Sequence, residues 1–166
     1  MSRGFVKEED QEEPVLIPPR AAIPEGVINY VTPNGLTELK QELKDLENER
    51  AEVKAENDTE KRRSQSLIDG KINLLAERLQ TARLLDPKDQ PEDEIRFGAN
   101  VKLQNENSGQ IREFQIVGVD EANIKKKKIA FVAPIAKAVT GKKVGEEINF
   151  TLGAETRKLK VLAISY

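Results

Sequence analysis

Three carboxylates lie close together near the middle of the chain, on Glu56, Asp58 and Glu60. A basic run, Lys61-Arg62-Arg63, follows them directly. Carboxylate oxygens are hard ligands that suit Mg²⁺, whereas lysine and arginine side chains suit phosphate groups. The same residue types also have a structural interpretation, because acidic side chains stabilise helix N-termini and basic runs often form a solvated helix face. Which interpretation holds depends on the elements that present this segment.

The residues on either side of the acidic segment predict an antiparallel helical hairpin. Seam residues, most of them apolar, recur in alternating steps of three and four residues in both arms, the spacing of a coiled coil. Paired from the outside in, the position numbers have a constant sum, so Leu36 faces Ala82 and Val53 faces Gln65. A constant sum indicates one chain folded back at a midpoint near Thr59. The seam positions are Leu36, Leu39, Leu43, Leu46, Arg50 and Val53, then Gln65, Ile68, Ile72, Leu75, Leu79 and Ala82.

We expect the hairpin to occupy residues 32–86, with its tip at 56–60. Thr32 can cap the first helix, which is expected to run to about Asn57. Asp58 or Thr59 can cap the second, which is expected to end near Leu85. Glycine inside a helix costs about 1 kcal/mol relative to alanine, so Gly70 is a weak point unless close packing requires it.

The segment before the hairpin, residues 1–31, predicts an irregular leader, because its prolines and charges oppose regular structure. The alternative is an extended segment that packs on the body of the protein, which Val15-Leu16-Ile17 and Val27-Ile28 favour. Residues 87–94 are polar and contain prolines, and are expected to form a linker.

From residue 95 to residue 166 the pattern changes to short alternating segments separated by turns, typical of strands at hairpin spacing. A short helix is expected at Pro134 to Val139, with proline at its start and Gly141 beyond its end. The fold class is therefore α+β: an N-terminal antiparallel helical hairpin followed by a small antiparallel β domain with a short helix.

Composition limits the chemistry available to the chain. Its 166 residues include no Cys and no His, which excludes disulfides, thiolate metal sites and the commonest general base. The net charge is −2, but residues 95–166 carry 13 basic and 7 acidic side chains, a net of +6. No apolar run approaches the roughly 20 residues of a membrane span, and the N-terminus does not resemble a signal peptide. We expect a cytoplasmic protein that has no membrane partner.

Three segments of the C-terminal half resemble motifs of the bacterial GreA/GreB transcription factors, and they occur in the family's order. They are residues 97–101 (FGANV), 115–122 (QIVGVDEA) and 133–146 (APIAKAVTGKKVGE), where Ala133 replaces the family's usual serine. In the hairpin, residues 31–36 (VTPNGL) and 70–72 (GKI) are similar to the family's helix start and return helix.

The resemblance implies a C-terminal domain of FKBP-like fold that docks on the rim of the secondary channel of RNA polymerase. It also implies that the hairpin passes down this channel toward the active centre. The docking candidates in the matched motif are Pro134, Lys137, Lys142 and Lys143. At the family's tip an Asp and a Glu help to hold the second Mg²⁺ and a water, so that the polymerase cleaves its own backtracked RNA. Such a factor is not itself an enzyme.

The family's acidic tip loop, G-D-L-[SK]-E-N, is absent from this chain. The hairpin is shorter by about 13 residues, close to one heptad from each arm, which resembles the short-armed Rnk proteins. At 1.5 Å per residue the loss of reach is about 10 Å. We therefore expect weak or no stimulation of cleavage, no metal bound by the isolated protein, and Mg²⁺ contact only through the polymerase active site.

Three interpretations of Glu56, Asp58 and Glu60 stay open: solvated turn and capping residues, contacts to basic groups in the channel, or ligands of the catalytic metal. The basic run Lys61-Arg62-Arg63 is either a solvated face or a contact to RNA phosphates or acidic polymerase groups. The expected partner is RNA polymerase, with contact to nascent RNA or DNA inside the elongation complex, and the intramolecular hairpin predicts a monomer. Two other functions are a coiled-coil or chaperone-like module without polymerase, and a peptidyl-prolyl isomerase.

Overall fold

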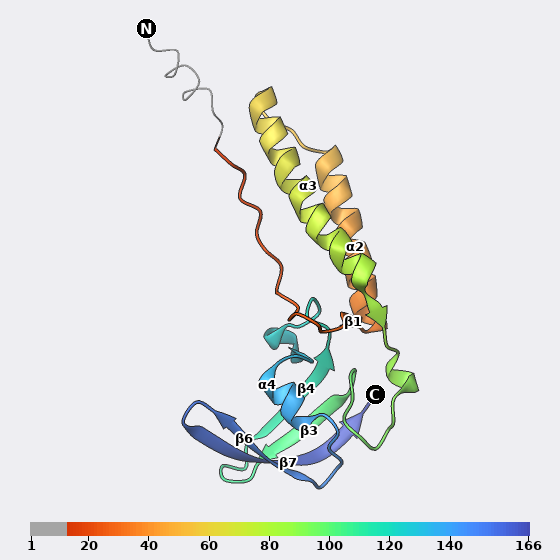
Figure 1. Cartoon of the computed structure of the whole chain (residues 1–166), viewed down its shortest axis with the longest axis vertical. Helices are drawn as coiled ribbons and strands as arrows, with labels where there is room; N and C mark the ends of the chain where they lie inside the picture. The colour runs from red at the N-terminus through yellow and green to blue at the C-terminus, as the bar shows by residue number, and fades with distance from the viewer. Residues whose placement is uncertain (1–12) are drawn as a thin grey trace.

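The computed structural model describes residues 13–166, and it places a helical hairpin at one end of the molecule and a curled sheet at the other (Figure 1). An extended leader runs beside the hairpin. The predicted α+β class, with an N-terminal hairpin followed by a β domain, is confirmed. The first twelve residues of the predicted leader lie outside the described part.

The hairpin consists of α2 (Pro33–Ala51) and α3 (Asp58–Thr81). Every apolar position of the predicted seam lies in one buried cluster, with Leu39, Leu46, Ile68 and Leu75 at its centre. Toward the tip the seam becomes polar, and Arg50 Nε donates to Asp69 Oδ1 across the two helices at 2.5 Å. No helix within residues 13–166 is long and apolar enough to cross a membrane.

The tip differs from the sequence expectation. Helix α2 ends at Ala51, six residues before the predicted end, and residues 52–57 form the connection. The cap of α3 is Asn57, whose side chain accepts a hydrogen bond from the Glu60 backbone at 2.8 Å. The chain needs several non-helical residues to reverse its direction between two helices. Because Asn57 caps α3 so early, these residues are taken from the predicted end of the first helix. Asp58 and Glu60 therefore lie in the first turn of α3.

The base of the hairpin is closed by two short parallel strands, β1 (Tyr30–Val31) and β2 (Arg83–Leu84). This pairing corrects two expectations, since α3 ends at Thr81 and the last two leader residues are regular structure. The backbone explains the early helix end, because the Arg83 and Leu85 amides donate to Asn29 and Val31 carbonyls at 2.9 and 3.0 Å. The chain then passes through a 3₁₀ turn, η1 (Pro87–Asp89), within the predicted linker.

The C-terminal domain is a five-stranded sheet of order β5-β4-β3-β7-β6. Its helix α4 (Pro134–Val139) lies at the predicted position, and a 3₁₀ turn, η2 (Ile124–Lys126), precedes β5. The strands are β3 (Asn100–Asn105), β4 (Ile111–Val117), β5 (Lys128–Ala130), β6 (Glu147–Leu152) and β7 (Glu155–Ser165).

The sheet is mixed, whereas an antiparallel sheet was predicted. Strand β5 pairs with β4 in parallel, with Ile116 opposite Ile129. The ten residues between these strands include a turn and η2, and this excursion lets the chain return in the same direction instead of forming a hairpin. All other strand pairs are antiparallel.

One face of the sheet packs with α4 in the main apolar core, where Ile135, Ala136 and Val139 are buried. All five aromatic side chains of residues 95–166 lie in or against this core: Phe97, Phe114, Phe131, Phe150 and Tyr166. Phe97 and Phe131 also contact Tyr30 of β1, with ring centroids 5.9 and 5.8 Å from the tyrosine ring. The aromatic residues therefore join the two parts of the molecule and fill the core, which is not the lining that an isomerase pocket needs.

Gly118, directly after β4, lies at a close backbone approach between the domain and β1. A Cβ atom at this position would lie 2.5 Å from the Tyr30 carbonyl oxygen. Because both groups are backbone, neither can rotate away, and only glycine fits.

We expect Gly118→Ala to lower the free energy of unfolding by about 1–3 kcal/mol, since overpacking forces the backbone to move. Urea denaturation followed by circular dichroism measures the effect. Asn73→Ala, at an exposed position of α3, serves as the control and is expected to stay within about 0.5 kcal/mol of wild type. A Gly118→Ala protein as stable as wild type would show that β1 is not held at this distance.

Candidate functional site

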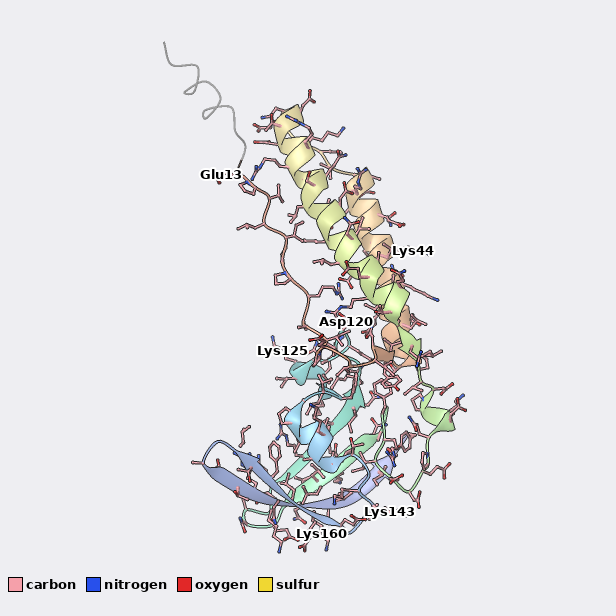
Figure 2. All side chains as sticks on the ribbon, in the orientation of Figure 1. Glu13, Lys44, Asp120, Lys125, Lys143 and Lys160 are labelled. Carbon is pink, nitrogen blue, oxygen red and sulfur yellow. The ribbon has the colours of Figure 1, made fainter. Side chains whose placement is uncertain are left out.

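The hairpin meets the C-terminal domain at the loop after β4, which carries two adjacent acidic residues, Asp120 and Glu121. Asp120 lies where the leader, the hairpin and the domain come together (Figure 2). Both carboxylates are nearly inaccessible, with 6% of the Asp120 side chain and 2% of the Glu121 side chain exposed. Buried carboxylates need partners, and here most partners belong to other parts of the chain. We name Asp120, Glu121 and the residues bonded to them the joint.

Glu121 ties the start of α2 to the C-terminal domain. Its carboxylate accepts hydrogen bonds from the Thr32 hydroxyl and, at 2.9 Å, from the Asn34 amide. Lys128 Nζ donates to the same carboxylate at 3.1 Å. Thr32 in turn caps α2 by accepting from the Gly35 backbone at 2.9 Å. The carboxylate also lies at the helix N-terminus, where negative charge is favourable.

Gly35, an unusual residue for a first helical turn, is explained by this contact. A Cβ atom there would lie 2.7 Å from Glu121 Oε1 and 3.3 Å from the Thr32 hydroxyl. Glycine therefore makes room for the carboxylate that holds the helix.

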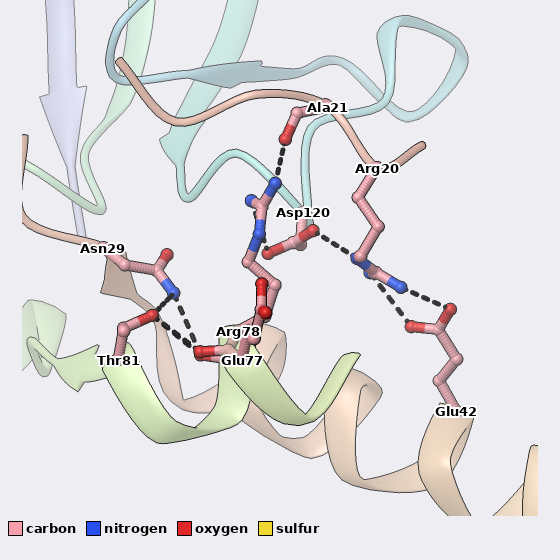
Figure 3. Close-up of polar contacts among 8 residues, drawn as sticks. All are labelled: Arg20, Ala21, Asn29, Glu42, Glu77, Arg78, Thr81 and Asp120. Atoms are coloured by element: carbon pink, nitrogen blue, oxygen red, sulfur yellow. Dashed lines mark hydrogen bonds and ion pairs between the residues drawn. The ribbon is translucent and has the colours of Figure 1, made fainter. Parts of the chain in front are cut away.

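Asp120 links the leader to the second helix (Figure 3). It pairs with Arg20 of the leader at 3.0 Å and with Arg78 of α3 at 3.3 Å. Arg20 also forms a forked pair with Glu42 of α2, at 2.8 and 3.1 Å. The hydrogen bond to Glu42, with further attraction from Asp120, raises the pKa of the Arg20 guanidinium above its ordinary value. One arginine thus connects the leader, α2 and the C-terminal domain.

At the far end of the hairpin, Glu56, Asp58 and Glu60 are all exposed. Asp58 and Glu60 occupy the first turn of α3, where acidic residues favour the helix. Within residues 13–166, no group of three acidic side chains is arranged to hold a metal ion. Asp58 and Glu60 thus lie where their charge favours the helix, whereas Glu56 lies in the connection before it.

The basic run next to the tip lies on α3 and meets the leader. Lys61 and Arg62 are exposed, and Arg62 Nη2 donates to Thr59 Oγ1 at 3.5 Å. Arg63 is half-buried, and its Nη1 donates to the Glu13 carbonyl at 2.5 Å. The leader therefore extends along the hairpin almost to its tip.

Comparison with known proteins adds to this geometry. Residues 90–166 match the family described as "Transcription elongation factor, GreA/GreB, C-term". The chain is 34% identical over 151 residues to the transcription elongation factor GreA of Thermodesulfovibrio yellowstonii, covering 82% of this chain and 96% of the relative. It is 33% identical to that of Acidiphilium cryptum, with the same coverage. The chain belongs to the GreA/GreB family of transcription elongation factors.

Solved structures similar to this GreA/GreB-family chain include GreA factor homolog 1 of Thermus thermophilus. That protein is 24% identical with a TM-score of 0.40, and the match covers 82% of this chain and 98% of the other. The GreA/GreB factor of Nitrosomonas europaea is 16% identical with a TM-score of 0.42, covering 84% and 99%. Membership of the family follows from the sequence relatives.

The docking candidates of this GreA/GreB-family chain lie on α4 and the loop after it. Pro134 and Lys137 are exposed on the helix. Lys142 lies 3.9 Å from Glu146, and Lys143 lies 3.5 Å from Asp93 and far from the hairpin (Figure 2). The structure does not bring these residues to the tip, so they form a second, separate surface.

Sequence reasoning did not single out Arg20, Asp120 or Glu121 as site residues. One available signal was the pair of acidic residues directly after the apolar run from Ile116 to Val119. Adjacent charges that end a buried strand need partners, although the sequence does not say which ones. A second signal was Arg20, a lone charge in an apolar, proline-rich part of the leader.

The two roles of the Thr32 hydroxyl give a direct test of the joint. We expect Thr32→Val to lower the free energy of unfolding by about 2 kcal/mol, because α2 loses its cap and Glu121 loses a donor. Thr32→Ser keeps the hydroxyl and is expected to retain most of the stability. Urea denaturation compares the two, and equal losses for Val and Ser would contradict the assignment.

Proposed function

We propose that this chain binds RNA polymerase and regulates elongation by inserting its hairpin into the secondary channel. Membership of the GreA/GreB elongation-factor family carries the proposal. The fold supports it, because the hairpin is an intact rod whose apolar seam is covered by its own second helix. A rod that covers its own seam has no need of a second copy, so the proposed active species is a monomer.

The proposed mode of action is occupation of the channel with little stimulation of RNA cleavage. Helix α2 has 19 residues and spans only about 28 Å. The six residues that connect it to α3 are not helical and do not lengthen it. Oxygen ligands must come within about 2.1 Å of Mg²⁺, so a tip that stops several Å short contributes nothing to the metal site. Glu56, Asp58 and Glu60 then act at most on charged groups of the channel wall.

The C-terminal domain is proposed to dock through α4, with Pro134 and Lys137 at the contact. Their exposure supports this assignment, because the apolar residues of the same helix are used in the core. Lys61-Arg62-Arg63 is proposed to approach RNA or acidic polymerase groups after insertion.

Polymerase association tests the docking surface. The protein is expected to co-purify with RNA polymerase at low salt, and Lys137→Glu is expected to weaken binding by about 1 kcal/mol, roughly fivefold in Kd. Lys160→Glu makes the same charge change on the other face of the sheet, because its neighbours Leu159 and Val161 point into the core beneath α4. Absence of association at low salt would refute polymerase binding, and equal effects of the two variants would refute docking through α4.

Cleavage assays test the short-hairpin argument. A stalled, backtracked elongation complex incubated with the protein and Mg²⁺ is expected to release short 3′ RNA fragments no faster than without the protein. A variant carrying Glu56→Gln, Asp58→Asn and Glu60→Gln is expected to behave in the same way. Rapid cleavage with wild type that is lost in the triple variant would establish a catalytic tip instead.

A further inference from the structure

The leader contacts the hairpin and the joint at three separate heights. Near the tip, the Glu13 carbonyl accepts a hydrogen bond from Arg63. At mid-height, Ile17 lies over Gly70. At the base, the Ala21 carbonyl accepts from Arg78, and Arg20 pairs with Glu42 and Asp120. The leader therefore follows one face of α3 from the tip to the C-terminal domain (Figure 1).

The spacing of these contacts fits an extended chain laid parallel to a helix. Ala21 lies four positions after Ile17, which is about 12 Å for an extended proline-rich segment at 3.1 Å per residue. Their partners Gly70 and Arg78 are eight helical residues apart, also about 12 Å at 1.5 Å per residue. Pro18 and Pro19 stiffen this span, so little conformational freedom is lost when it docks.

Gly70 provides the seat for Ile17. A Cβ atom at Gly70 would overlap the Ile17 side chain. The glycine that weakens the interior of α3 thus gives the leader a close approach to the helix, and the partner in this approach is the leader rather than α2.

The hairpin is a long rod attached to the C-terminal domain at a small joint, so a small change of angle at the joint moves the tip far. Helix α3 has 24 residues and is about 36 Å long, so a swing of about 10° at the joint would move the tip by about 6 Å. The apolar seam holds the two helices to each other and does not fix their direction relative to the sheet. The bonds of the joint do so, and Arg20 adds the leader to them, because it is bonded at the same time to Glu42 of the hairpin and to Asp120 of the C-terminal domain.

We propose that residues 13–22 are an intramolecular strap that fixes the direction of the hairpin relative to the C-terminal domain, with Arg20 as its positioning residue. The role of the strap in transcription rests on the proposed channel function. The strap itself is a property of the free protein and can be tested without polymerase. Release of the strap frees the hairpin to swing about the joint.

Distance measurements on the free protein test the strap. The chain has no cysteine, so Thr59→Cys at the tip and Ser108→Cys in the turn between β3 and β4 accept spin labels at those two sites only. Pulsed electron paramagnetic resonance is expected to give a narrow distance distribution for the wild-type background. Arg20→Glu is expected to broaden it by several Å, because the variant repels both Glu42 and Asp120.

A conservative variant provides the comparison. Arg20→Lys keeps a positive charge beside both Glu42 and Asp120, and is expected to keep most of the narrow distribution. Arg157→Glu, at an exposed local ion pair in β7, is the matched control and is expected to change nothing. A distribution that stays narrow in Arg20→Glu, or one that is as broad in Arg20→Lys as in Arg20→Glu, would overturn the proposal.

The seat at Gly70 gives a second measurement. Gly70→Ala is expected to broaden the distribution in the wild-type leader, and to have no further effect once Ile17→Ala has removed the contact. Urea midpoints of all variants show whether the hairpin remains folded.

Polymerase affinity, measured in parallel, separates the two proposals. Loss of affinity in Arg20→Glu, with most of the affinity kept in Arg20→Lys, would support the strap. An absence of wild-type binding with intact distance effects would refute only the proposed function.

Discussion

The buried charges of Asp120 and Glu121 are the constraint on which the arrangement of the molecule depends. A carboxylate removed from water is costly unless charged or hydrogen-bonding partners surround it. In this chain the partners come from the leader, from α2, from α3 and from the start of β5. Satisfying two adjacent side chains therefore brings four separate segments to one place, and these bonds together set the direction of the hairpin.

The two parts of the structure are stabilised by different kinds of interaction. The seam between α2 and α3 is apolar, and burial of apolar surface is non-directional, so it makes the rod without setting where the rod points. Hydrogen bonds and forked ion pairs at the joint are directional, and they set the angle between the hairpin and the sheet. Gly35 and Gly118 serve the same contact between the hairpin and the C-terminal domain. The first leaves room for the Glu121 carboxylate, and the second leaves room for the Tyr30 carbonyl.

Periodic patterns in the sequence predicted the helical hairpin. Features that depend on a single contact between residues far apart in the sequence could not be predicted. The seam could be predicted because Leu39, Leu46, Ile68 and Leu75 recur at a fixed period, and the domain because its motifs resemble a family. The end of α2 could not, since the choice between Asn57 and its neighbours as a cap depends on how the reversal is made. The joint could not either, because Arg20 and Asp120 are a hundred residues apart and no local pattern pairs them. The parallel pairing of β5 depends similarly on the path of the loop between the strands.

The course of the leader also determines the cross-section of the rod. Two packed helices, each about 10 Å wide, present a nearly symmetric outline. Here a third, extended segment lies along one side of α3 for most of its length, so the outline has a single ridge. A rod with a single ridge fits a closely matching opening in only one rotation about its long axis. The side chains around the tip would then face the same side of that opening each time.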